Sequence, residues 1–225
     1  MPSLHWLIGE IGAAQPPLTR PGAALVGLAA LGAVGLSASW RVVRHIQVMA
    51  HEASHAVVGS ALGMRITGVR LMRDGRGETR MRTGRGGDVA TTLAGYLGPS
   101  AYGLGVAGLL AARHSAAVLW FTLLLLLALL ALLRNLFGAL SVLALGALIL
   151  AIAWYAPVGW QTIAAYGIAW VLLLSGVRNV VHRWSGSADA AHLAAITPLP
   201  ALAWAWLWLV ATVAALAAGA FLLLR

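Results

Sequence analysis

Long apolar segments, separated by short polar breaks, make up most of the chain. A helix that spans a bilayer needs about 20 mainly apolar residues, and the segments have about this length. The pattern therefore predicts an all-α polytopic membrane protein, with a bundle of about six to seven transmembrane helices in one integral-membrane domain (residues 1–225). The expected spans are residues 23–39, 42–62, 89–112, 116–133, 136–155, 161–177 and 200–224.

One stretch, residues 66–82, does not have the pattern of a membrane helix. Its β-branched and apolar residues partly alternate with arginines, and Asp74-Gly75 is a favoured hairpin turn. We predict a short membrane-associated β-hairpin here, directly after the second expected span. A solvated basic loop is the alternative, because the alternation is broken in places.

The overall composition supports a membrane location. Hydrophobic residues make up 61% of the chain and charged residues 9%, and the mean hydropathy is +0.88. So few charges cannot cover the surface of a soluble protein of this size, so most of the exterior must face lipid. The chain has no cysteine, which excludes disulfides, a thiol nucleophile and thiolate metal ligands. Any metal ligands must therefore be His, Asp or Glu.

The net charge of +9 comes from arginines whose placement indicates membrane topology. Seven of them lie between Arg65 and Arg85, and most of the others lie at the ends of apolar segments. No recognition motif accompanies this charge, so we expect lipid headgroups and no nucleic acid as its partner. All fifteen basic residues are arginine, and together with the excess of Ala, Leu and Gly this indicates a GC-rich bacterial genome. We expect the bacterial cytoplasmic membrane, with the N-terminus and the arginine-rich hairpin on the cytoplasmic side.

The second expected span contains the chemistry. His51 and His55 are four residues apart, so they share one face of a helix and can bind a single metal ion. Glu52, beside the first histidine, is placed to accept a proton from an attacking water. Ionisable groups are costly in lipid and usually mark function there. The alternative, in which the two histidines are only a packed helix face, is therefore the weaker interpretation.

A catalytic zinc site normally has a third protein ligand. Asp74 and Glu78 fall in the hairpin, and a helix N-cap role explains Asp88. Asp189 is expected on the same side of the membrane as the metal-binding turn, and it is our first candidate. Its alternative role is to stabilise the first turn of a helix. His192, three residues later, is the second candidate, although such a histidine more often hydrogen-bonds to the metal ligands or lies at the membrane interface.

The ordered motifs resemble the site-2-protease-like intramembrane zinc metallopeptidases, in particular the short bacterial branch without a PDZ domain. The resemblance covers most of the chain: the His-Glu-Ala-Ser-His motif, the glycine-containing hairpin, the segment Leu-Ala-Gly-Tyr-Leu-Gly-Pro at 93–99, and residues 188–200 before a Trp-rich last helix. Two details differ from well-studied members. Asp189 is not followed by glycine, and no asparagine lies near Gly98.

The resemblance implies a specific site and a specific reaction. His51, His55 and Asp189 would bind one Zn²⁺ ion per chain, and Glu52 would be the catalytic acid and base. The hairpin would border the substrate cleft. The implied substrate-binding residues are Val69, Leu71, Gly95, Gly98 and Pro99.

We therefore predict an intramembrane zinc metalloprotease. It would hydrolyse a peptide bond in or near a transmembrane segment of a membrane protein, in regulated intramembrane proteolysis. The expected partners are this membrane-protein or peptide substrate and the lipid bilayer, and no oligomeric state is predicted. The alternatives are a catalytically inactive membrane scaffold, or a metal-binding or transport protein that retains the motif.

Overall fold

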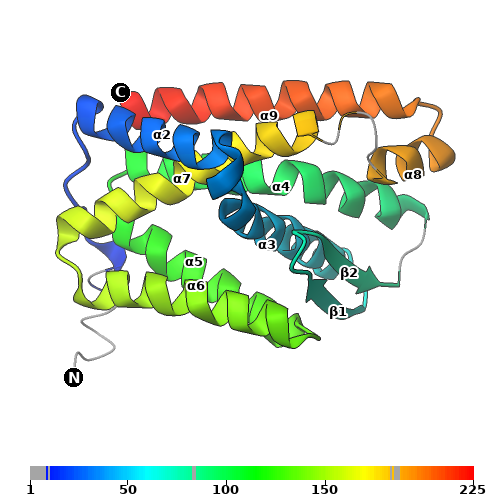
Figure 1. Cartoon of the computed structure of the whole chain (residues 1–225), viewed down its shortest axis with the longest axis horizontal. Helices are drawn as coiled ribbons and strands as arrows, with labels where there is room; N and C mark the ends of the chain where they lie inside the picture. The colour runs from blue at the N-terminus through cyan, green and yellow to red at the C-terminus, as the bar shows by residue number, and fades with distance from the viewer. Residues whose placement is uncertain (1–8, 10, 83–84, 183, 185–187) are drawn as a thin grey trace.

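The computed structural model describes residues 9, 11–82, 85–182, 184 and 188–225. Within this part of the chain there are eight helices and one small antiparallel sheet, which lies at the periphery of the bundle beside α3 (Figure 1). The elements are α2 (Arg20–Gly35), α3 (Ser37–Ala61), β1 (Ile66–Leu71), β2 (Gly77–Met81), α4 (Arg85–Ala111), α5 (Ser115–Leu132), α6 (Leu136–Tyr155), α7 (Val158–His182), α8 (Ala188–Ile196) and α9 (Ala201–Leu224).

Five helices are long and apolar enough to cross a membrane: α4, α5, α6, α7 and α9. The helices α2 and α3 meet the same test only as a pair, and this pair is bent by 99°. Counted as one span, the pair gives six crossings in the described residues, the lower figure of the expected six to seven. The first two expected spans thus form one bent pair of helices, in which neither helix meets the test alone. The polar residues of α3, including the metal motif, explain why it does not qualify alone.

Side chains that bond to the end of α2 hold the bend. Leu36 leaves helical geometry, with φ −76° and ψ 136°. The hydroxyl of Ser39 donates to the carbonyl oxygen of Ala33 over 2.8 Å, and Arg178 on α7 donates to the carbonyl oxygen of Val34. The Arg178 guanidinium also lies 4.5 Å from the ring centroid of Trp40 on α3. These contacts satisfy carbonyls that a helix end leaves without partners, and they fix the direction in which α3 departs.

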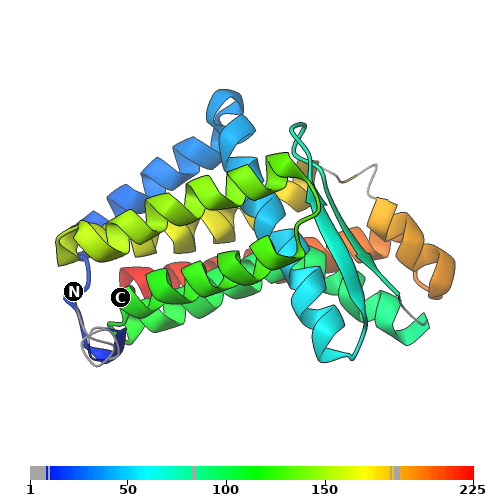
Figure 2. The ribbon, with the colours of Figure 1, turned by 90° about the horizontal axis from the view of Figure 1, so that it is seen from below.

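The predicted hairpin is confirmed. β1 pairs antiparallel with β2, Val69 opposite Thr79 and Leu71 opposite Gly77. Gly75 in the turn has φ +73°, a conformation that favours glycine. Figure 2 shows the hairpin lying beside α3.

The outer edge of β1 is occupied by the junction between α5 and α6. The backbone N–H of Arg134 donates to the carbonyl oxygen of Val69 over 2.9 Å. The side chain of Asn135 both accepts from the N–H of Leu71 (3.2 Å) and donates to its carbonyl oxygen (2.7 Å). β1 is thus bonded on both edges, whereas β2 has β1 as its one strand neighbour in the described chain.

The central helix pair is α4 and α7, which approach closely at small residues. A Cβ atom added at Gly103 would lie 3.0 Å from Cγ of Leu173, and one added at Gly176 would contact the hydroxyl of Ser100. Small residues permit such close packing in lipid. By contrast, Leu124, Leu127 and Leu148 on α5 and α6 are more than half exposed, as expected for helices that face acyl chains.

The segment before α2 and the hairpin lie at opposite ends of the bundle. The backbone N–H of Gln15 donates to the carbonyl oxygen of Arg113, at the α4–α5 turn. The hairpin is bonded to the α5–α6 junction, at the other end of α5. The expectation from the sequence put both features on one side, because it counted α2 and α3 as two crossings. A single crossing by the bent pair would instead put these two features on opposite sides of a membrane. Figure 1 shows the C-terminus at the end where α2 begins.

Candidate metal centre

The helix α3 brings the two histidines of the motif together. Nε2 of His51 lies 3.2 Å from Nε2 of His55, so both ring nitrogens face the same point. Two imidazole ligands at about 2.0–2.1 Å from a tetrahedral zinc ion lie about 3.3 Å apart. The observed separation therefore fits a shared metal ion.

A glycine on α4 makes room for both imidazole rings. A Cβ atom added at Gly95 would lie 2.6 Å from Cε1 of His55 and 2.8 Å from Cε1 of His51. Any larger side chain would displace the rings. The next residue, Tyr96, has its ring 5.3 Å from that of His51 and stacks on Trp208 of α9 at 4.0 Å. The histidine pair thus rests against a rigid aromatic and glycine surface.

The carboxylate of Glu52 is buried, with 4% of the residue exposed, and lies against β2. The hydroxyl of Thr79 donates to Oε2 of Glu52 over 2.6 Å. A Cβ atom added at Gly77 would overlap the carboxylate, with 2.6 Å to its carbon Cδ. The hairpin therefore holds the predicted catalytic base directly.

These groups line a polar cavity of about 500 Å³ between α3, β2, α4, α7 and α8. Asp189 and His192 of α8 line it too, and Asp189 interacts electrostatically with His55. In the residues described, however, no three His, Asp or Glu side chains are close enough together to hold a metal ion as they stand. Asp189 thus reaches the cavity without contacting the histidine pair closely, and its role as third ligand stays a prediction.

The acidic residues of the hairpin form salt bridges with arginines. A carboxylate oxygen of Asp74 lies 2.7 Å from Arg76, and one of Glu78 lies 2.8 Å from Arg80. The hydrogen bond from Arg80 lowers the pKa of Glu78, and that from Arg76 lowers the pKa of Asp74. This pairing agrees with their exclusion as metal ligands.

The implied substrate-binding residues do not line the polar cavity. Val69 and Leu71 are buried in the apolar core, with 0% and 2% exposed, and Pro99 is also fully buried. Gly95 lies behind the imidazoles. Gly98 packs against Ser54 on the other face of α3.

Asn179 and Thr79 are among the residues of the site that the sequence interpretation missed. Asn179, with 9% exposed, lines the cavity from α7, and Thr79 lines it from β2. A polar residue within an apolar helix is the signal that could have identified Asn179. Nothing in the sequence singles out Thr79.

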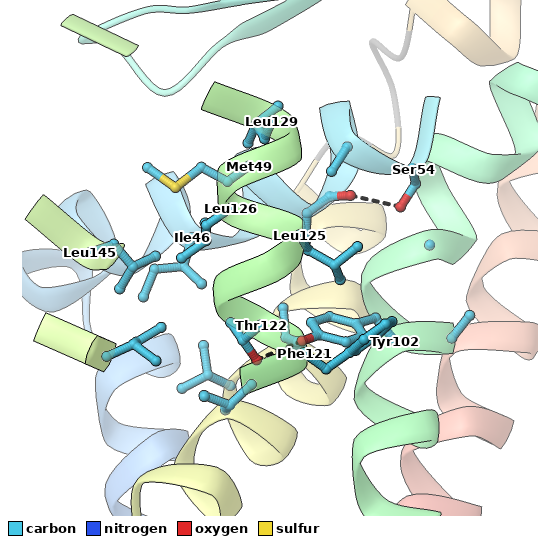
Figure 3. Close-up of a pocket in the computed structure, with 18 of the residues that line it drawn as sticks. Ile46, Met49, Ser54, Tyr102, Phe121, Thr122, Leu125, Leu126, Leu129 and Leu145 are labelled. Carbon is cyan, nitrogen blue, oxygen red and sulfur yellow. Dashed lines mark hydrogen bonds between the residues drawn. The ribbon is translucent and has the colours of Figure 1, made fainter. Parts of the chain in front are cut away.

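A second cavity lies on the opposite face of α3 (Figure 3). Its volume is about 610 Å³, and almost all of its lining is apolar, from α3 to α7. Its polar atoms are already bonded: Ser54 donates to the carbonyl oxygen of Ala50 (2.7 Å), and the hydroxyls of Tyr102 and Thr122 lie 2.6 Å apart. One helix therefore separates a polar chamber that contains the motif from an apolar one.

Comparison with known families gives one match. The family model described as Peptidase M50B-like matches residues 24–219, which include the whole metal motif, the hairpin and α8. No curated protein and no solved structure gives a significant match.

Proposed function

Because the chain belongs to the Peptidase M50B-like family, the site-2-protease family, we propose that it is an intramembrane zinc metalloprotease. It hydrolyses a peptide bond in or near a transmembrane segment of a membrane protein. One observation carries this proposal: the facing nitrogens of His51 and His55 share a polar cavity with the buried carboxylate of Glu52, inside a bundle of membrane-spanning helices.

The histidine pair and the Gly95 surface fit a zinc ion, and we propose one ion per chain. His51 and His55 would hold it, with Asp189 of α8 as the third ligand. When bound, zinc polarises the scissile carbonyl and makes water a nucleophile at neutral pH. The cavity has room for a peptide segment and for this water.

The residues of the chain then move the protons. Glu52 accepts a proton from the attacking water while the oxygen of this water bonds to the carbonyl carbon. It then gives a proton to the leaving amine as the C–N bond breaks. Asn179 lines the same cavity and can donate hydrogen bonds from its amide to a substrate carbonyl oxygen.

The substrate must be extended at the cleaved bond, because a helix hides its carbonyls in its own hydrogen bonds. A substrate that adds as a strand to the hairpin would be held in this extended conformation. β1 is excluded, since its outer edge is bonded to Arg134 and Asn135. We propose that the substrate adds to β2, whose residues line the polar cavity.

The proposed location is the bacterial cytoplasmic membrane, with the hairpin and the mouth of the polar cavity on the cytoplasmic side. The arginines of the hairpin support this orientation. A scaffold or transport function is less well supported, because the ionisable groups are gathered in one cavity and do not form a route along the bundle.

Two substitutions test the proposal in purified protein reconstituted with a panel of single-span peptides. Glu52→Gln should keep stoichiometric zinc and lose cleavage by about 10²-fold or more, since proton transfer contributes about this much. His55→Ala should lose both zinc and cleavage. Zinc content by mass spectrometry and cleavage by gel or mass analysis are the measurements. Full activity of Glu52→Gln would contradict the proposed reaction.

The same zinc assay distinguishes the two candidates for the third ligand. Asp189→Asn should weaken zinc binding, whereas His192→Asn should leave it nearly unchanged. The opposite result would assign the third ligand to His192.

A further inference from the structure

The contact between β2 and Glu52 has a role that the reaction above does not use. Thr79 lies in the middle of β2, opposite Val69. Its hydroxyl is 2.6 Å from Oε2 of Glu52 and 3.3 Å from the backbone carbonyl oxygen of the same residue. The shorter distance lies at the short end of the range for O–H···O hydrogen bonds.

This bond restricts the orientation of the Glu52 carboxylate. A glutamate has three rotatable bonds, and only some rotamers aim its carboxylate at the histidine pair. Thr79 bonds one carboxylate oxygen, while the backbone of Gly77 packs directly on the carboxylate group. Because Gly77 has no side chain, the strand can approach this closely.

The strand itself is firmly held, so it can serve as a support. β2 is paired with β1 along its length. β1 is in turn bonded to the α5–α6 junction by both polar atoms of the Asn135 side chain. Thr79 is therefore tied to a helix pair distant in sequence from Glu52, and its position does not depend on α3 alone.

We propose that Thr79 is a positioning residue, which orients the carboxylate of Glu52 for proton transfer. The inference rests on the proposed function of Glu52 as acid and base. It also gives the hairpin a second role, because the strand that would receive the substrate also places the base. The same strand, β2, would therefore position both the base and the extended peptide.

The test compares two substitutions of Thr79, one that removes the hydroxyl and one that keeps it. Thr79→Val keeps the β-branched shape and the strand preference but removes the donor, whereas Thr79→Ser keeps the donor. Thr79→Val should lower kcat about 10- to 100-fold, because a misplaced catalytic group costs about this much. KM should stay within about twofold, since strand addition uses the backbone. Thr79→Ser should restore kcat to within about threefold of wild type.

The chain offers a matched control on the neighbouring strand. The hydroxyl of Thr67 on β1 donates to the carbonyl oxygen of Arg80 and is exposed, outside the polar cavity. Thr67→Val therefore makes the same chemical change in the same hairpin, and its kcat should equal that of wild type. Zinc content and thermal stability, measured for every variant, separate a local effect from misfolding.

An infrared measurement tests the contact without turnover. The chain has only three glutamates, Glu10, Glu52 and Glu78, so ¹³C-glutamate labelling gives a simple carboxylate spectrum. In zinc-free protein, Thr79→Val should shift the band that Glu52→Gln removes, and Thr67→Val should not.

The results separate this inference from the proposed function. Wild-type kcat in Thr79→Val, equal loss in Thr79→Val and Thr79→Ser, or an unshifted Glu52 band would each overturn the role of Thr79. Activity in Glu52→Gln would instead overturn the proposed reaction, and the infrared comparison would still decide whether Thr79 holds the carboxylate.

Discussion

At the scale of single residues, the site combines what is local in sequence with what is distant. His51 and His55 were identified because one turn of helix brings residues i and i+4 together whatever surrounds them. Thr79 and Asn179 come from other elements, and only the packed fold brings them to Glu52 and the histidines. The pattern of residues along the chain does not predict such contacts.

Gly95 gives a prediction at this scale. Gly95→Ala adds a Cβ atom 2.6 Å from His55 and 2.8 Å from His51, so the rings must move from their shared point. Zinc affinity should fall about 10- to 100-fold, the usual cost of disturbing the surroundings of metal ligands. Competition with a fluorescent zinc chelator measures the change.

The control is Gly105→Ala on the same helix, where an added Cβ meets no atom within 4 Å. This variant should bind zinc as wild type does. Equal affinity in the two variants would show that Gly95 does not hold the imidazoles in place.

At the scale of elements, apolar segment length predicted α4, α5, α6, α7 and α9 well, because hydrophobic length is a local property. The hairpin followed from its turn residues. The bend between α2 and α3 could not be predicted, since Arg178, 144 residues beyond Val34, helps to hold it. The implied substrate-binding role of Val69 and Leu71 faces a similar difficulty, since the α5–α6 junction occupies the edge of their strand.

The bend gives the prediction at this scale. Arg178→Ala removes a charged hydrogen bond to Val34 and a cation–π contact with Trp40. The free energy of unfolding should fall by about 2 kcal/mol, and zinc binding should weaken because α3 is no longer held at its start. Denaturant titration in detergent measures stability. Arg41→Ala, which removes an exposed arginine beside the same bend, should change stability by less than about 0.5 kcal/mol.

At the scale of the whole molecule, the bent pair determines which loops share a side of the membrane. Arg134 lies at the hairpin end, together with the arginine-rich strands, while Arg113 and Gln15 lie at the other end. Because arginines concentrate at the hairpin end, we predict that this end is cytoplasmic. With six crossings, the beginning of α2 and the end of α9 then both face the outside.

Labelling of single cysteines tests this topology, and the cysteine-free chain provides a clean background. Arg73→Cys in the hairpin turn should react with a membrane-impermeant maleimide only in inverted vesicles. Ala14→Cys, an exposed position before α2, should react only in right-side-out vesicles. Reaction of both from one side would contradict the six-crossing arrangement, and exchange of the two patterns would reverse the orientation.

The position of α3 between two chambers has a consequence for chemical probes. The helix α3 separates the polar cavity from the apolar cavity, so water-soluble and lipid-soluble reagents should enter different cavities. Hydrophilic chelators should remove the metal ion from the two imidazoles. A lipophilic photoactivatable label should instead react with Met49 and Leu126, which line the apolar cavity on the other side of α3. An inhibitor that joined a zinc-binding head to a hydrocarbon tail would have to reach around this helix, because it cannot pass through it.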